Sequence, residues 1–164
     1  MTLRPQLALQ VRTDRVQTCF HSPRSKSQDR CRHCHGVCDP TKYRLMIGSL
    51  IYLTITRPDL SYSVGLLSQF MQNPRNLHLD CAKRILRYVS ATMDYDIAYK
   101  SNTSIRLEGY TDADWAGYKA DQRSTSGFVF SLGSGAISWS SKKQSTVALS
   151  STEAEYRGAT VAAC

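Results

Sequence analysis

Two groups of acidic residues, about forty positions apart, are the part of this chain whose residue types and spacing could support chemistry. Asp112 and Asp114 follow a run rich in β-favouring residues, and a tryptophan comes directly after them. Glu153 and Glu155 lie in a segment with the pattern of a helix start. Carboxylates from a strand and a helix could meet in space and hold a hard divalent cation such as Mg²⁺, which takes oxygen ligands.

The two aspartates also have a structural interpretation. Aspartate is favoured in turns that follow strands, so Asp112 and Asp114 could each be turn residues instead of metal ligands. Asp114 in particular is expected to face solvent or to accept hydrogen bonds within a loop. On their types alone, both interpretations stay open.

The two glutamates have different expected roles, because they occupy different positions in the expected helix. Glu153 stands three residues after Ser150, the spacing of a capping box, so its carboxylate is assigned to the helix start. Glu155 shares a helical row with Ala159 and Ala162. We predict that these small residues let the row approach the strand that carries the aspartates, which would direct Glu155 toward that strand.

The chain has 164 residues and a net charge of +8, a charge that suits a partner carrying phosphates. Apolar runs of membrane-spanning length and a secretory signal are both missing from the sequence. An intracellular protein, cytoplasmic or nuclear, with reduced cysteines is therefore expected.

Residues 1–38 differ from the rest of the sequence. They contain seven Lys or Arg against two Asp and show no sustained hydrophobic period, a composition that predicts a disordered basic leader. Cys31, Cys34, His35 and Cys38 crowd together there. Three interpretations stay open for this cluster: chance, a zinc site, and the Cys-x-x-Cys-His pattern of haem attachment.

Residues 39–95 predict a helical module. Apolar residues recur at helical spacing over three stretches, and Asn73-Pro74 is expected to end the second because the residue before proline avoids the helical region. Thr56 is a candidate cap for that second helix. The three expected helices are 40–55, 58–72 and 77–91.

Residues 96–164 change to the alternating pattern of strands. A tight turn at Gly133-Ser134-Gly135 joins two of them, and a polar loop at 142–148 precedes the final helix, which starts near Ser150. Together with the helical module this predicts a mixed α+β or α/β chain. The expected strands are 96–99, 105–111, 125–132 and 136–140.

With these features the sequence resembles the end of the polymerase polyprotein of copia-type retrotransposons. The resemblance covers about 39–164 and depends on seven landmarks in the same order. They are 43–53, Thr56-Arg57-Pro58-Asp59, 82–88, Thr111-Asp112-Ala113-Asp114-Trp115, 123–127, 137–144 and Ser151-Thr152-Glu153-Ala154-Glu155-Tyr156.

The resemblance implies a helical connection at the end of a reverse transcriptase, followed by the first β-β-β-α half of a ribonuclease H-like fold. Asp112 matches the family's first catalytic aspartate and Glu155 its catalytic glutamate, both Mg²⁺ ligands in hydrolysis of the RNA strand of an RNA–DNA hybrid. The family's other two acidic residues would lie after Cys164. A truncated fragment without useful catalysis is therefore expected.

The competing expectation is a non-catalytic basic protein that binds nucleic acid or docks on an intact polymerase polyprotein. Arg123, Lys142 and Lys143 could contact phosphates, which dominate affinity in such complexes. They could equally be a solvated charged loop.

Overall fold

The computed structural model describes residues 39–101, 104–117 and 121–164. The basic leader and its cysteine cluster lie outside these described residues, so the predictions about them stay predictions. The chain divides into two compact units, of which the first ends at Tyr95 and the second begins at Asp96. Each unit is described by itself.

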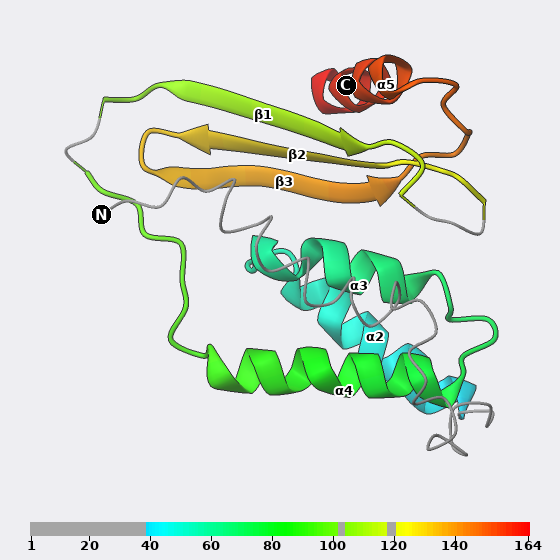
Figure 1. The fold of residues 1–164 in the computed structure, drawn as a ribbon. Coiled ribbons are helices and arrows are strands. Elements are labelled where there is room, and N and C mark those ends of the chain that lie inside the picture. Colours follow the sequence, from blue (N-terminus) through cyan, green and yellow to red (C-terminus); the bar gives the residue numbers. More distant parts are fainter. Residues whose placement is uncertain (1–38, 102–103, 118–120) are drawn as a thin grey trace, which may run out of the picture. The chain divides into compact units, whose positions relative to one another are not determined.

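The first unit is helical (Figure 1). Its elements are α2 (Pro40–Leu53), the short 3₁₀ helix η2 (Pro58–Leu60), α3 (Ser61–Ser68) and α4 (Asn76–Ala91). α2 begins sharply because the Asp39 carboxylate accepts a hydrogen bond from the backbone N–H of Thr41, and proline stands at the first helical position.

One hydrophobic core joins the three long helices of this unit. Its largest member is Tyr43, which is fully buried and donates its hydroxyl hydrogen bond to the Leu67 carbonyl at 2.8 Å. The hydroxyl therefore costs little to bury. The buried members are Tyr43, Ile47, Leu50, Leu60, Val64, Leu67, Cys81, Ala82 and Ile85.

The first and third expected helices form close to their predicted bounds, whereas the second differs. It is split into η2 and a shorter α3 that ends at Ser68. Thr56 does not cap it: the Thr56 hydroxyl donates to the Leu53 carbonyl at 3.3 Å and so serves the end of α2. Arg57 precedes η2 without a side-chain cap hydrogen bond.

The second unit is a three-stranded antiparallel sheet with one helix, which makes the chain mixed α+β. Its strands, β1 (Leu107–Asp114), β2 (Thr125–Leu132) and β3 (Gly135–Lys143), lie side by side in that order. Asp112 pairs with Gly127 across β1 and β2. Gly133, at a φ of 61°, supplies the left-handed residue of the tight turn between β2 and β3.

Three strand predictions need correction. The strand expected at 105–111 runs instead from Leu107 to Asp114, so Asp112 and Asp114 lie within it and do not follow it. Residues 96–99 are not a strand: Tyr99 instead donates its hydroxyl hydrogen bond to the Ala136 carbonyl at 2.6 Å, so the segment is held by side chains and not by a ladder. β3 continues three residues past the predicted end. Lys142 and Lys143 therefore belong to a strand and not to a loop, because their backbones pair with Ser126 and Thr125.

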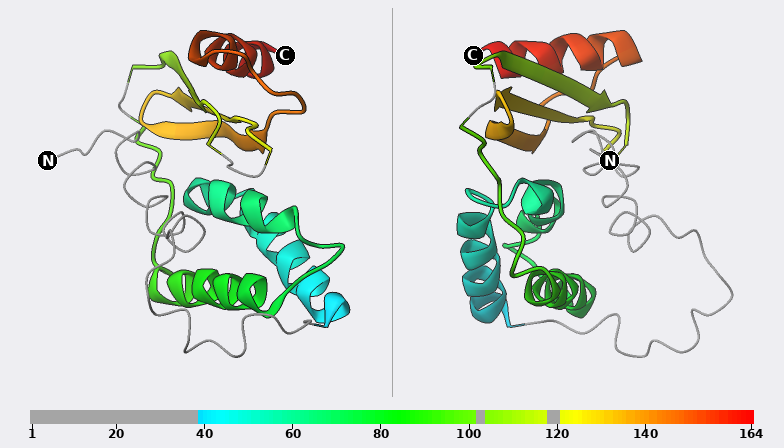
Figure 2. Two further views of the ribbon diagram at one scale, coloured as in Figure 1. Left: turned by 45° about the vertical axis from the view of Figure 1, so that its right-hand side comes forward. Right: turned by 90° about the vertical axis from the view of Figure 1, so that its left-hand side faces the viewer.

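The last helix, α5 (Ser151–Ala163), lies along one face of the sheet, as Figure 2 shows from two further sides. Its buried residues are Ala154 and Gly158, and Ala162 is half-buried. The predicted packing row of Glu155 and Ala159 is exposed. The prediction was wrong by one residue, which is a rotation of about 100° on a helix of 3.6 residues per turn.

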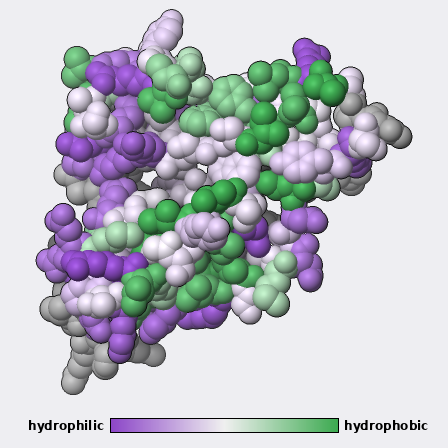
Figure 3. All heavy atoms as spheres, turned by 180° about the vertical axis from the view of Figure 1, so that it is seen from behind, coloured by the Kyte–Doolittle hydropathy of each residue, from purple (hydrophilic) through white to green (hydrophobic). Residues whose placement is uncertain are grey.

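Both units leave apolar side chains at the surface, and Figure 3 shows hydrophobic groups reaching it on the face drawn. Ile105 and Leu149 are the most exposed, at 86% and 88%. In the part of the chain that the structure describes, every helix is too short or too polar to cross a membrane.

Candidate carboxylate site on the sheet unit

The end of β1 carries the two aspartates on one side and a buried alanine on the other. Ala113 is 8% exposed and packs in a small cluster with Ala148 and Ala154, so it faces α5. Successive side chains of a strand point to opposite faces. Asp112 and Asp114 therefore belong to the sheet face that α5 does not cover.

Asp114 is tied to the neighbouring strand. Its side chain is half-buried and accepts a hydrogen bond from the backbone N–H of Thr125. Burial raises the pKa of the Asp114 carboxyl above its usual range, against the hydrogen bonds from Thr125, and the negative charge of Asp112 raises it further. The loop hydrogen-bonding role expected for Asp114 is present, although the side chain does not lie free in solvent.

The segment after β1 is anchored by two hydrogen bonds. Ala116 has a φ of 53° and its N–H donates to the buried Ser124 hydroxyl at 3.3 Å. The indole Nε1 of Trp115 donates to the Ala148 carbonyl at 3.1 Å, just before α5 begins. The end of β1 and the approach to α5 are thus fixed to one another.

Gln144 joins β2 to α5. Its side-chain nitrogen donates to the Ser126 hydroxyl at 2.8 Å and to the Ala154 carbonyl at 3.0 Å. At Gly158 a Cβ would lie 3.4 Å from the Ser126 hydroxyl and 3.6 Å from the Ala113 methyl group. α5 therefore packs close to the sheet at Gly158, where a methyl group would still make ordinary contacts.

Glu153 serves the start of α5, as predicted. The Ser150 hydroxyl accepts from the Glu153 N–H at 3.1 Å, and the Glu153 carboxylate accepts from the Leu149 N–H at 2.8 Å and pairs with Arg157 at 2.7 Å. The hydrogen bond from Leu149, followed by the contact with Arg157, lowers the pKa of the Glu153 carboxyl. This carboxylate is committed to local structure.

Asp112 and Glu155, the two predicted ligands, lie on elements that pack together but are not gathered into a larger site. Both side chains are exposed. Among the described residues, no three His, Cys, Asp or Glu side chains are close enough to hold a metal ion together. This part of the chain therefore does not form the several-carboxylate arrangement that a two-metal site needs.

The three basic residues expected near this site differ in how they are engaged. Lys143 pairs with Asp121 at 2.8 Å, and Arg123 lies 3.7 Å from the same carboxylate. Although slight burial opposes it, the hydrogen bond from Lys143 lowers the pKa of the Asp121 carboxyl. Lys142 is exposed on β3. Two of the three charges are thus partly neutralised.

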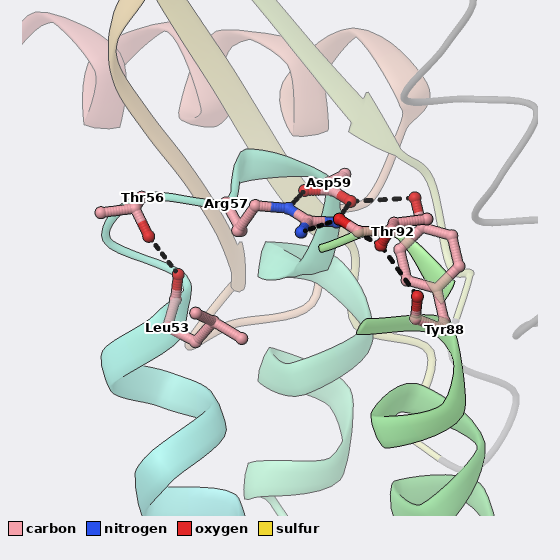
Figure 4. Close-up of polar contacts among 6 residues, drawn as sticks. All are labelled: Leu53, Thr56, Arg57, Asp59, Tyr88 and Thr92. Atoms are coloured by element: carbon pink, nitrogen blue, oxygen red, sulfur yellow. Dashed lines mark hydrogen bonds and ion pairs between the residues drawn. The ribbon is translucent and has the colours of Figure 1, made fainter. Parts of the chain in front are cut away.

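A buried polar network in the helical unit was missed from the sequence (Figure 4). Arg57, only 8% exposed, binds the Asp59 carboxylate with two hydrogen bonds of 3.0 and 2.8 Å. Its other donors reach the Thr92 carbonyl and hydroxyl, each at 2.8 Å. Tyr88 donates its hydroxyl hydrogen bond to Asp59 at 2.9 Å. The network fastens η2 to the end of α4.

Burial opposes the ionisation of Asp59, yet hydrogen bonds from Arg57 and Tyr88 outweigh it and hold the pKa of the Asp59 carboxyl below its usual value. The local signal for this pair was Arg-Pro-Asp, in which charge and countercharge are two positions apart. The contacts of Arg57 with Thr92 span 35 residues, so periodicity could not reveal them.

Comparison with known proteins gives close relatives over most of the chain. The Pol polyprotein of transposon RE1 from Arabidopsis thaliana is 56% identical over 119 residues, which are 73% of this chain and 8% of that protein. The corresponding polyprotein of transposon TNT 1-94 from Nicotiana tabacum is 45% identical over 72% of this chain and 9% of its own length. Secreted RxLR effector protein 161 from Plasmopara viticola is 50% identical over 70% of this chain and 81% of that protein.

No family model matches the sequence, and no solved structure matches it. The matched region is less than a tenth of the transposon polyproteins. Several such polyproteins nevertheless match at 45–56% identity across the same share of this chain. The chain belongs to the family of retrovirus-related Pol polyproteins of copia-type transposons.

Proposed function

We propose that residues 96–164 are the β-β-β-α part of a ribonuclease H-like domain that acts on RNA–DNA hybrids. The observation that carries the proposal is Asp112 near the end of β1, on a strand against which α5, the helix with Glu155, packs. Membership in the Pol polyprotein family supports it.

The described carboxylates fit a weakly held, hydrated Mg²⁺ and not a pair of metal ions. Mg²⁺ commonly keeps several waters and is bound through one or two carboxylates together with substrate phosphates. Asp112 is exposed on a rigid strand and could supply one such ligand directly. Because Glu155 belongs to the helix on the opposite face of the sheet from Asp112, it would contribute through a water that the cation keeps. We propose that these two residues contribute to a site that other groups complete, and that residues 39–164 alone have no useful hydrolytic activity.

A Mn²⁺ titration followed by NMR line broadening tests the metal ligands. We expect broadening centred on Asp112 that Asp112→Asn abolishes and Glu155→Gln weakens. Two matched controls are Asp121→Asn and Glu153→Gln, because each removes one carboxylate charge from the same unit. An equal loss of Mn²⁺ broadening in the two control variants would overturn the assignment of these ligands. Broadening that is unchanged in Asp112→Asn would overturn it as well.

Incubation with a labelled RNA–DNA hybrid and Mg²⁺ tests the activity. We expect binding that weakens with salt, since phosphate contacts release counterions, and no RNA cleavage above background. Cleavage that Asp112→Asn abolishes would show that the chain is an active nuclease, and no hybrid binding at low salt would contradict the proposed substrate.

A second candidate function is non-catalytic docking on an intact polymerase polyprotein. In the described residues β1 pairs only with β2, so its other edge presents backbone groups to which a further strand could bind. Co-purification with an intact polyprotein, abolished when proline replaces an edge residue of β1, would favour docking over hybrid binding.

A further inference from the structure

His78 is the one histidine in the part of the chain that the structure describes, and it lies in the first turn of α4 with only 8% of its surface exposed. Its ring stacks on Phe70 in the loop 69–75 between α3 and α4, with 3.9 Å between the ring centroids. Its Nδ1 accepts a hydrogen bond from the Arg75 N–H at 3.1 Å. One side chain therefore contacts both ends of the loop.

The hydrogen bond from Arg75 fixes the protonation state of the His78 ring. A backbone N–H can only donate, so Nδ1 must accept and carries no proton. The neutral ring with its proton on Nε2 meets this condition. An imidazolium has a proton on both nitrogens and would place an N–H against the N–H of Arg75. Protonation of His78 therefore breaks its contact with the end of the loop.

The surroundings of His78 also favour the neutral ring. Burial lowers the pKa of the His78 imidazole below its usual range, and the positive charge of Arg75 lowers it further. Arg44 of α2 brings a second positive charge to the same loop, because its Nε donates to the Met71 carbonyl at 2.9 Å. These contacts offer an imidazolium no compensating negative charge.

The helices of the same core bring one negative group, which has its own partner. Asp80 is the acidic residue of α4, and its carboxylate lies 3.7 Å from the Lys83 ammonium. The remaining charged residues of α2, α3 and α4 are positive and cannot favour an imidazolium: Lys42, Arg84 and Arg87. Their tyrosine and cysteine side chains are ordinarily uncharged near neutral pH: Tyr43, Tyr52, Tyr62, Cys81 and Tyr88.

We propose that His78 is a pH switch in the helical unit: the neutral ring holds the loop 69–75 on α4, and protonation at mildly acidic pH releases it. Arg75 is also the N-cap residue of α4, and its carbonyl accepts from the N–H groups of His78 and Leu79 at 2.9 and 3.2 Å. Release of Arg75 therefore loosens the first hydrogen bonds of the helix. The switch acts within the helical unit and does not depend on the carboxylate site.

Urea unfolding of the full chain, followed by circular dichroism at pH 7.5, 6.5 and 5.5, tests the proposal. Because folding lowers the pKa of His78, its contribution to stability is complete well above the ordinary histidine pKa of about 6.5 and is lost as the pH falls through that value. The unfolding equilibrium constant should rise severalfold between pH 7.5 and pH 5.5, by at most about tenfold for each pH unit. A constant that stays the same over this range would overturn the proposal.

His78→Gln is the test variant. Glutamine at the third helical position can accept the N–H of the N-cap residue, so it keeps the contact with Arg75 but does not titrate. We expect its unfolding constant to be independent of pH over this range. The matched control is the triple variant His21→Gln, His33→Gln and His35→Gln, which should keep the full pH dependence. Wild-type pH dependence in His78→Gln, or its loss in the triple variant, would overturn the proposal.

NMR of the wild type tests the switch without any substitution. The ¹⁵N shifts of the His78 ring at pH 7.5 should show a proton on Nε2 and none on Nδ1. On acidification, the Arg75 amide resonance should move with the same pKa as the His78 ring, and that pKa should lie below about 6.5. A higher pKa would show that the Phe70 ring stabilises the imidazolium, since aromatic faces attract cations, and would overturn the proposal. An Arg75 amide that does not respond to the titration of His78 would overturn it as well.

Discussion

Two half-buried carboxylates, Asp59 in the helical unit and Asp114 in the sheet unit, differ in their surroundings. Asp59 in the helical unit accepts hydrogen bonds from Arg57 and Tyr88, which lower its pKa in spite of burial. Asp114 in the sheet unit is buried beside a second carboxylate, Asp112, and its pKa is raised. One unit neutralises its buried charge, whereas the other keeps two negative charges together.

The hydrophobic core of the helical unit is also larger than that of the sheet unit. Nine buried residues, most of them large, fill the helical unit, whereas Ala113, Ala148 and Ala154 are the buried cluster of the sheet unit. Hydrophobic stabilisation scales with the apolar area removed from water. The helical unit is therefore expected to be the more stable one. A carboxyl whose pKa is raised beside a second carboxylate, as at Asp114, is typical of a functional site.

Asp59→Asn should have the largest effect on this comparison. It leaves the Arg57 guanidinium with no countercharge in a largely buried position. Breaking a buried pair costs about 3–5 kcal/mol, and we expect about 3 because the Asp59 side chain keeps some exposure. Urea unfolding followed by circular dichroism at the helical band measures the decrease in stability.

Both tryptophans of the chain, Trp115 and Trp139, lie in the sheet unit, so tryptophan fluorescence follows that unit separately. Asp59→Asn should leave the fluorescence transition unchanged. Asp94→Asn, at an exposed position of the helical unit, is the matched control and should change neither transition. A shift of less than about 1 kcal/mol for Asp59→Asn would show that the network adds little stability.

Acid should weaken the helical unit through the same carboxylate. Because folding lowers the pKa of Asp59, the ionised Asp59 carboxylate stabilises the folded state. This contribution is complete above the ordinary aspartate pKa of about 3.9 and is lost as the pH falls through the lower folded value. The urea midpoint of the transition seen by circular dichroism should therefore decrease as the pH is lowered from 5 to 2. Asp59→Asn should remove part of that pH dependence. Equal pH dependence in the two proteins would contradict the assignment.

Substitution of Gly158 tests the close packing of α5 on the sheet. Gly158→Leu would push side-chain atoms into Ser126 and Ala113, and overpacking of this kind costs about 1–3 kcal/mol. Gly158→Ala makes ordinary contacts there and gains helix propensity, so we expect it to stabilise the sheet unit by about 0.5–1 kcal/mol. The tryptophan transition measures both. Equal stability of the leucine variant and the wild type would mean that α5 does not pack through this row.

The sequence alone predicted the elements whose signals are local. The helix from Asn76 to Ala91 carries a full amphipathic stripe, and β2 from Thr125 to Leu132 was predicted at the bounds it has. The errors lie where contacts between residues distant in sequence determine whether a strand forms and where it ends. Residues 96–99 alternate like a strand but are held through the Tyr99 hydroxyl, and β3 is extended because Lys142 and Lys143 find partners on β2.

The site was predicted less completely than the fold, for a related reason. The rotation of α5 depends on Gln144, whose amide binds both Ser126 and Ala154, and no helical periodicity encodes that contact. The capping role of Glu153 was predictable because it acts within one helical turn. The assignments of Asp112 and Glu155 as ligands derive from family resemblance and stay predictions.

Asp114→Asn should have the smallest effect, in contrast to the matching change at Asp59. A raised pKa means that the folded state disfavours the ionised carboxyl, so at neutral pH the charge of Asp114 costs folding free energy. Asparagine keeps an oxygen to accept the Thr125 N–H and removes the repulsion with Asp112. We therefore expect the tryptophan transition to change by no more than about 0.5 kcal/mol, and toward higher stability. A decrease above about 2 kcal/mol would show that the charge itself holds the end of β1 in place, and that the carboxylates of the two units stabilise their surroundings in the same way.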